Sequence, residues 1–157
     1  MKEKNGEHPF GDTGQLIFLA LFIIVWVLDS FVMRISTLPS TYLPLYVRLP
    51  VALVVFAFSI YLAKASHHVV GSDQRPQQVI SDGIFSRMRH PLYMSVILFY
   101  LALIIPTFSI ISFALWILIF FFYNFIAGYE EKLMEEKFGQ DYITYKQKTA
   151  KWLPGVW

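Results

Sequence analysis

Long apolar runs alternate with polar segments along this chain. The first run covers residues 16–33 and is broken only near its end, and the others cover residues 45–63, 92–105 and 108–127. A helix rises about 1.5 Å per residue, so roughly 20 apolar residues cross the 30 Å hydrocarbon core of a bilayer. The pattern predicts an all-α, polytopic helical membrane protein with about four transmembrane helices, at residues 16–34, 45–64, 88–105 and 108–128.

The third run is the shortest of the four. Residues 92–105 would form a helix of only about 21 Å. Such a helix either starts earlier, near Phe85, or is enclosed by its neighbours. Only Pro106 and Thr107 separate it from the fourth run, and so short a connection predicts an antiparallel helical hairpin.

Three polar segments fall on one side of the predicted membrane. They are residues 1–14, a long loop from Ser66 to Arg89, and a tail over residues 129–157. Eleven of the 13 Lys and Arg residues lie in or beside them, and the other side has only Arg34 and Arg48. Because basic residues favour the cytoplasmic side, both termini and the loop are expected in the cytoplasm. The tail is predicted to be a cytoplasmic amphipathic helix.

Composition agrees with a membrane protein and narrows the chemistry. Hydrophobic residues make up 56% of the chain and charged residues 15%, where a soluble domain carries roughly 25% charged. Nothing marks a second domain, so residues 1–157 are expected to form one. The first run is too long for a signal peptide, which predicts a retained span. The absence of cysteine excludes disulfides, thiolate metal sites and a cysteine nucleophile.

The segment from Val79 to Tyr93 contains the first group of candidate functional residues. Pro91 suits the first turn of a helix, which puts His90 at its cap and leaves first-turn N–H groups able to bind a carboxylate. His90 and Tyr93 are three residues apart, so they can face one ligand. The alternative is a basic collar with an aromatic anchor at the membrane surface.

The tail contains the second group. Apolar residues recur there every three or four positions, at Leu133 or Met134, Phe138, Tyr142 and Tyr145. Glu130 and Glu131 stand at the junction with the membrane, a costly place for two acids unless they are used. The alternative is a helix lying on the bilayer, with these glutamates paired to Lys132 or Lys137.

Four other polar residues have a simpler interpretation. Asp29 lies deep in an apolar run, and a structural role is favoured, either paired with Arg34 or Arg48 or near the far headgroups. Arg48 is expected to extend toward the headgroups. His67 and His68 are adjacent and have no third ligand nearby, so no metal site is expected.

Taken in order, the two candidate groups resemble a known family. Arg89-His-Pro-Leu-Tyr93, preceded by the turn Ile80-Ser-Asp-Gly-Ile-Phe85, resembles the cofactor motif of the isoprenylcysteine carboxyl methyltransferase family, which the related phospholipid N-methyltransferases share. A hairpin of apolar helices follows. The family's order then continues with Glu130-Glu131, Phe138-Gly139, Tyr142, Tyr145 and Trp152-Leu-Pro154. The resemblance covers about half of the chain.

The resemblance implies a membrane enzyme that uses S-adenosylmethionine. The cofactor would come from the cytosol, and the acceptor would be a lipophilic or prenylated molecule or a membrane lipid that enters between helices; no nucleic-acid partner is expected. The cofactor-binding residues would be Gly83, Arg89, His90, Tyr93 and Glu130.

Two residues would take catalytic roles by the same resemblance. Glu131 matches the family's functionally important glutamate. Lys137 stands where the family commonly has an arginine that orients the acceptor's carboxylate, and lysine lacks its two-pronged grip. Ser95 also departs from the family, which often has glycine there. A carboxylate acceptor needs no base, whereas an amine or thiol must lose a proton, for which Glu131 or His90 is the nearest candidate.

Other functions fit parts of the pattern. Carboxyl methylation of an isoprenylcysteine-like acceptor is the leading hypothesis, and methylation of a phospholipid amine is the alternative within the same chemistry. Membrane sterol reductases have a similar hairpin, but they usually show Asn where this chain has Pro91. A non-catalytic scaffold gives no reason for both groups to occur in order on one face of the membrane.

Overall fold

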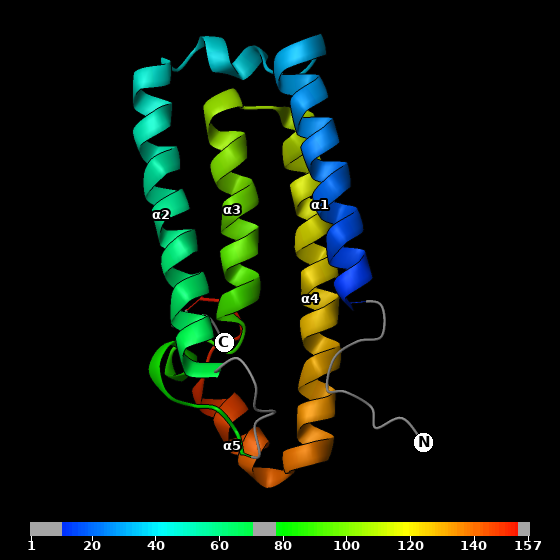
Figure 1. Ribbon diagram of the computed structural model, residues 1–157, viewed down its shortest axis with the longest axis vertical. Coiled ribbons are helices and arrows are strands. Elements are labelled where there is room, and N and C mark those ends of the chain that lie inside the picture. The colour runs from blue at the N-terminus through cyan, green and yellow to red at the C-terminus, as the bar shows by residue number, and fades with distance from the viewer. Residues whose placement is uncertain (1–10, 71–77, 154–157) are drawn as a thin grey trace.

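The computed structural model describes residues 11–70 and 78–153. Its regular elements are helices, and four long ones run side by side (Figure 1). The α-helices are α1 (Gly11–Val27), α2 (Leu45–Val70), α3 (Pro91–Thr107), α4 (Ile110–Phe138) and α5 (Gln140–Lys148). The predicted all-α, polytopic membrane fold is confirmed.

The long helices form two pairs that share a core. α2 packs along α3, while α1 and α3 pack on α4. The core residues are Phe22, Ile97, Tyr100, Ile104, Ile119 and Tyr123. The outer faces carry exposed aliphatic side chains, such as Val54 and Leu118, which suits contact with lipid because lipid tails are as apolar as the side chains themselves.

Within the part of the chain that the structure describes, three helical segments are long and apolar enough to cross a membrane: Thr13–Met33, Leu45–His68 and Ile110–Phe138. α3 has 17 residues, about 26 Å of helix. It starts at Pro91, later than residue 88, because proline at the first helical position has no N–H to bond. Many of its side chains are buried, so of the two alternatives for the third run the enclosed helix is correct.

The hairpin between α3 and α4 is confirmed, but its turn lies later than expected. α3 includes Pro106 and ends where Phe108 adopts a left-handed conformation, with φ of 49°. Ser109 then caps α4, its side chain accepting a hydrogen bond from the Ser112 amide at 3.0 Å. The turn therefore consists of Phe108 and Ser109.

Two helix boundaries at the end of the bundle that carries α5 differ from those expected. α2 continues through Ser66, predicted to start a loop, because the Ser66 hydroxyl donates to the Leu62 carbonyl at 2.7 Å and stays within the helix. Residues 71–77 of that loop lie outside the described residues. α4 has 29 residues, about 44 Å, so roughly its last ten residues extend beyond a 30 Å hydrocarbon core.

A buried polar network joins the helices at the opposite end. α1 continues into a π-helical turn, η1 (Leu28–Met33), which contains Asp29. The Asp29 carboxylate accepts hydrogen bonds from Ser36 and Ser109. Arg48 is buried and donates to the Pro106 carbonyl at the end of α3. The structural role of Asp29 is thus supported, but among the described residues its side-chain partners are serines, so the expected arginine partner was wrong. The expectation that Arg48 extends toward the headgroups was also wrong.

Candidate active site

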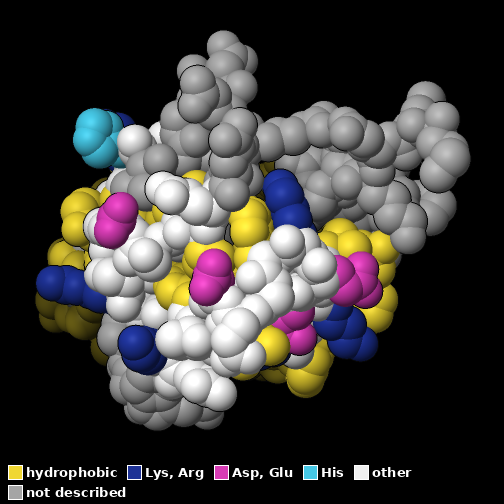
Figure 2. Space-filling model, turned by 90° about the horizontal axis from the view of Figure 1, so that it is seen from below, with side chains coloured by type: hydrophobic (Ala, Val, Ile, Leu, Met, Phe, Trp, Pro, Cys, Tyr) yellow, Lys and Arg dark blue, Asp and Glu magenta, His cyan; other side chains and the backbone are white. Residues whose placement is uncertain are grey.

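The end of the bundle that carries α5 has a mixed polar surface. Seen from that end, acidic and basic side chains lie among hydrophobic ones (Figure 2). A short 3₁₀ turn, η3 (Gly83–Ser86), precedes α3 there, and Gly83 has φ of 59°, which favours glycine. Tyr145 on α5 donates a hydrogen bond to the Phe85 carbonyl at 2.7 Å. The turn is therefore fixed between α3 and α5.

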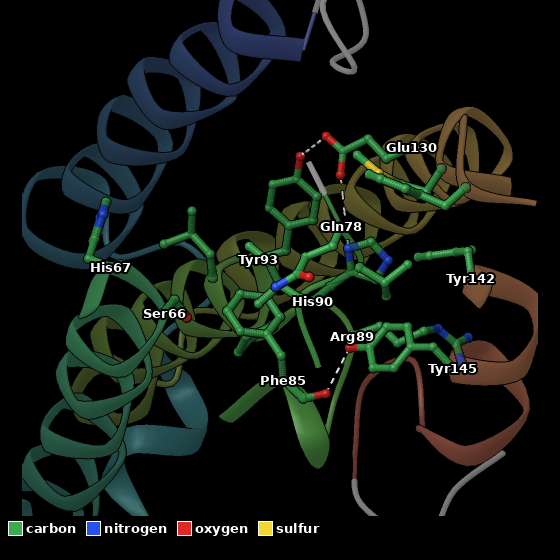
Figure 3. Close-up of a pocket in the computed structure, with 16 residues that line it drawn as sticks. Ser66, His67, Gln78, Phe85, Arg89, His90, Tyr93, Glu130, Tyr142 and Tyr145 are labelled. Atoms are coloured by element: carbon green, nitrogen blue, oxygen red, sulfur yellow. Dashed lines mark hydrogen bonds and ion pairs between the residues drawn. The ribbon is translucent and has the colours of Figure 1, made fainter. Parts of the chain in front are cut away.

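A pocket of about 310 Å³ opens between these elements, at the lower end of the size range of small-molecule sites. Five segments contribute to it: the end of α2, the segment before α3, the start of α3, the end of α4, and α5 (Figure 3). The lining includes five aromatic side chains, those of Phe85, Tyr93, Phe138, Tyr142 and Tyr145. The apolar stripe of the tail thus faces a pocket, which contradicts a helix lying with that stripe on the bilayer.

Glu130 is the carboxylate that lines this pocket. Its side chain accepts a hydrogen bond from the Tyr93 hydroxyl (Figure 3). The rings of Tyr93 and His90 are stacked, with centroids 5.7 Å apart and planes 4° apart. His90 and Tyr93 both line the pocket; that they face one ligand there stays a prediction.

Glu131 lies behind His90 and does not line the pocket. One of its oxygens, Oε1, is 3.1 Å from His90 Nε2 and 3.0 Å from Arg89 Nε, and the other, Oε2, is 3.1 Å from Lys146 Nζ. Lys146 also contacts Glu135 at 2.7 Å. Glu131 is on α4, and its contacts therefore connect α4 to the start of α3 and to α5.

These contacts decide the protonation state of Glu131. Burial alone would raise its pKa, but the hydrogen bond from His90, the charge of Arg89 and the hydrogen bond from Lys146 outweigh burial and lower the pKa to about 2. An ionised carboxylate only accepts hydrogen bonds, so His90 must carry its proton on Nε2. Glu131 is thus an anchored anion that orients His90.

His90 itself is held neutral. Burial lowers its pKa below the usual 6.5; Glu131 opposes this shift, while the charges of Lys151 and Arg89 reinforce it. With the proton on Nε2, the Nδ1 lone pair is the one that can accept a proton. The nearest carboxylate oxygen of Glu130 is 3.9 Å from Nδ1, close enough to stabilise positive charge there.

The segment after α5 closes one side of the site. The Arg89 amide donates to the Ala150 carbonyl at 2.9 Å, and the Arg89 guanidinium donates to the carbonyls of Lys146 and Thr149. The Trp152 ring then packs 5.8 Å from His90. Lys151 and Trp152 both donate to the Asn124 side chain, which ties this segment to α4.

Most of the site residues predicted from the sequence lie together in the structure. Arg89, His90, Tyr93 and Glu130 all line the pocket, and Glu131 supports it from behind. Gly83 lies at a neighbouring surface hollow with Arg87 and His68. Lys137 is exposed, with its ammonium 5.0 Å from the ring centroid of Phe138, which does line the pocket. Its predicted role in orienting the acceptor stays a prediction.

Two contributions were missed. Lys146 holds Glu131, but these residues are distant in the sequence and meet only because the chain turns at Gly139. The end of α2 supplies Ser66 and His67 to the pocket, and no local motif marks them. They belong to α2, which continues to Val70, beyond its expected end at residue 64.

Together, fold and site define a helical membrane protein with a small-molecule pocket at one membrane surface. A sequence profile of the phospholipid methyltransferase family matches residues 47–141, more than half of the chain. The chain therefore belongs to the phospholipid methyltransferase family, which confirms the resemblance to membrane methyltransferases. Among curated proteins none matches the chain. The matched segment contains His90, Tyr93, Glu130 and Glu131.

Proposed function

We propose that this protein transfers a methyl group from S-adenosylmethionine to a polar group of a membrane lipid. The observation that carries the proposal is the aromatic pocket at one end of the bundle, with the Glu130 carboxylate and His90 in its lining. Membership of the phospholipid methyltransferase family supports the same class of reaction.

The lining suits this cofactor. S-adenosylmethionine supplies a methyl group on a positively charged sulfur. Aromatic faces and a carboxylate attract such a cation, and the pocket provides both in Tyr93, Tyr142 and Glu130. The first turn of α3 presents backbone N–H groups where an amino-acid carboxylate can bind. Arg89 and Phe85 would shape part of the remaining wall, and Gly83, just outside the pocket, would set the turn that carries them.

Positioning is the main task of the protein in such a reaction, because the leaving sulfur is neutral. Glu131 holds His90 in one orientation and one tautomer. Arg89 and Lys146 hold Glu131 in turn, and the segment around Trp152 excludes water from one side. Glu131 is therefore proposed as a positioning residue, while His90 and Glu130 face the reacting groups.

An amine is the acceptor that this lining favours. An ammonium group must lose a proton before it can be methylated, and the His90 Nδ1 lone pair beside Glu130 can receive that proton. The Glu131 carboxylate and the Arg89 guanidinium already form an ion pair with each other, so neither group is available to bind an acceptor.

A carboxylate acceptor, as in isoprenylcysteine methylation, is the second candidate. The observation that favours it is Lys137, a cation beside Phe138 at the edge of the pocket. Assays with labelled cofactor on a phospholipid extract and on a prenylcysteine analogue separate the two candidates. Loss of methylation of the prenylcysteine analogue in Lys137→Ala, with methylation of the phospholipid extract unchanged, would support the carboxylate acceptor.

The first test is binding of S-adenosylmethionine and S-adenosylhomocysteine to the detergent-purified protein by calorimetry. We expect saturable binding that weakens in His90→Ala and Glu131→Gln. Unchanged binding and turnover in Glu131→Gln would remove its positioning role. A folded, monodisperse protein that binds neither compound would overturn the proposal, and nicotinamide cofactors would then be tested.

A further inference from the structure

A second cavity lies inside the membrane-spanning part of the bundle. It has a volume of about 460 Å³ and lies where α1, α2, α3 and α4 face one another. Most of its lining is apolar, with Leu16, Leu19, Phe56, Ile60 and Phe99 among the side chains. Leu16 is 67% exposed and Ile60 is 40% exposed, so the edges of the cavity reach the lipid-facing surface between the two helix pairs.

Two tyrosines give this apolar cavity a polar wall. Tyr100 and Tyr123 both line it, and each is only 1% exposed. Among residues 11–70 and 78–153 neither hydroxyl is hydrogen-bonded to another residue, and neither oxygen is among the fully enclosed, unpaired polar atoms, so both hydroxyls keep access to open space. Each hydroxyl can therefore donate a hydrogen bond to a ligand that brings an acceptor to this depth.

The second cavity continues from the first along the helices. On α2, Ala63 lines the inner cavity and Ser66 the outer pocket; on α3, Val96 and Tyr93 do the same. The rings of Tyr93 and Tyr123 are 5.2 Å apart. The outer pocket and the inner cavity therefore adjoin at these rings, which places both within reach of one elongated molecule.

We propose that the Tyr100 and Tyr123 hydroxyls donate hydrogen bonds to the ester carbonyls of a diacyl glycerolipid whose chain occupies the inner cavity. The placement of the lipid headgroup near Tyr93 and Glu130 rests on the proposed function. The placement of the ester groups depends only on the inner cavity and its two tyrosines.

The lengths agree with this placement. Tyr93 and Tyr100 are seven residues apart on α3, about 10 Å along the axis. In a glycerophospholipid with an ethanolamine headgroup, about nine bonds join the amine to the ester carbonyl carbon. An extended chain covers roughly 1.1–1.2 Å per bond, so this path also spans roughly 10 Å. With the amine beside Tyr93, the carbonyls reach the level of Tyr100.

The proposal predicts a preference between two lipids that differ only in the linkage. A diacyl lipid has ester carbonyls, whereas its di-O-alkyl analogue has the same headgroup and chain length but no carbonyl. Neutral hydrogen bonds contribute modestly, so each hydroxyl is expected to favour the diacyl lipid about three- to tenfold. A prenyl chain without carbonyls at this depth would gain nothing from these hydroxyls.

Competition between diacyl and di-O-alkyl phosphatidylethanolamine, measured by native mass spectrometry of the detergent-purified chain, tests the site. The variants are Tyr100→Phe and Tyr123→Phe, which remove only the hydroxyls. Tyr61→Phe is the matched control, because Tyr61 is on α2 but outside the inner cavity. We expect wild type and Tyr61→Phe to prefer the diacyl lipid and the two cavity variants to lose most of that preference.

No preference in the wild type, or an undiminished preference in both cavity variants, would overturn the proposal. Binding of S-adenosylhomocysteine, measured on the same samples, separates this result from the fate of the proposed function. Loss of cofactor binding with an intact, tyrosine-dependent lipid preference would contradict the methyltransferase assignment and leave the lipid site in place.

Discussion

Two neighbouring glutamates have different environments in this site. Glu130 lines the pocket and accepts a hydrogen bond from Tyr93, while Glu131 is enclosed by His90, Arg89 and Lys146. Adjacent residues of a helix point about 100° apart, so one faces the ligand space and the other faces the protein. The sequence marks the pair as important but does not say which of the two touches a ligand.

Exchanging each glutamate for glutamine tests this division of roles. Glu130→Gln should weaken S-adenosylmethionine binding roughly tenfold, about 1.4 kcal/mol, with less effect on S-adenosylhomocysteine, whose sulfur carries no charge, and little effect on the melting temperature. Glu131→Gln should lower the free energy of unfolding by roughly 3 kcal/mol, because Arg89 and Lys146 lose their anion. Calorimetry and thermal unfolding in one detergent measure both. Equal effects of the two substitutions on both readouts would contradict the assignment.

The lowered pKa of His90 predicts how stability depends on pH. Below pH 6.5 the unfolded chain binds a proton at this residue, and the folded chain does not until its lower pKa is reached. The contribution of His90 to the free energy of unfolding is therefore fully present above pH 6.5. It decreases as the pH drops, by at most about 1.4 kcal/mol per pH unit. Thermal unfolding measured from about pH 7.5 to about pH 5.5, a range that brackets the usual histidine pKa of roughly 6.5, tests this dependence.

Two variants isolate the contribution of His90 from that of other titrating groups. His90→Gln should show a shallower loss of stability over this pH range than the wild type. His68→Gln, at an exposed position on α2, should follow the wild-type curve. A wild-type slope retained in His90→Gln would show that another group carries the dependence.

At the scale of elements, the turn between α4 and α5 assembles the site. Gly139 ends α4 with φ of 56° and ψ of −128°, a conformation that side chains strongly disfavour. The turn brings Tyr142, Tyr145 and Lys146 back toward the start of α3. Without it, the tail would continue as one helix away from the pocket.

Gly139→Ala should therefore loosen α5. No atom lies within 4 Å of the added methyl group, so the penalty comes from the backbone alone and should be about 1–3 kcal/mol. Gly128→Ala is the matched control, since it adds the same methyl inside α4 with its nearest neighbour, Lys151 Nζ, at 3.7 Å. It should be neutral or slightly stabilising. Limited proteolysis and thermal unfolding should separate the two, and equal behaviour would argue against a strained turn.

The elements show what local sequence can and cannot predict. Apolar runs located the helices because membrane helices must satisfy their backbone internally and cover it with apolar side chains. Pro91 located the start of α3, since proline without an N–H fits the first turn. The end of α2 and the bend at Gly139 were not located, because both depend on contacts with residues distant in the sequence. The pairing of Lys146 with Glu131 was hidden for the same reason.

At the scale of the whole molecule, the polar residues are divided between two ends with different tasks. The far end carries a structural network around Asp29, and the near end carries the pocket. The distribution of Lys and Arg favours a cytoplasmic location for the near end, where S-adenosylmethionine is available. This orientation is an inference from charge and can be tested directly.

The absence of cysteine allows a clean test of orientation. Single cysteines can replace Tyr42, which is 88% exposed between α1 and α2, and Gln147, which is exposed on α5. In intact cells, a membrane-impermeant maleimide should label Tyr42→Cys and leave Gln147→Cys unlabelled, because only the first would lie outside the cytoplasm. Permeabilised cells should label both. The reverse pattern in intact cells would place the pocket on the outer surface, away from the cytosolic cofactor, and would contradict the proposed function together with the orientation.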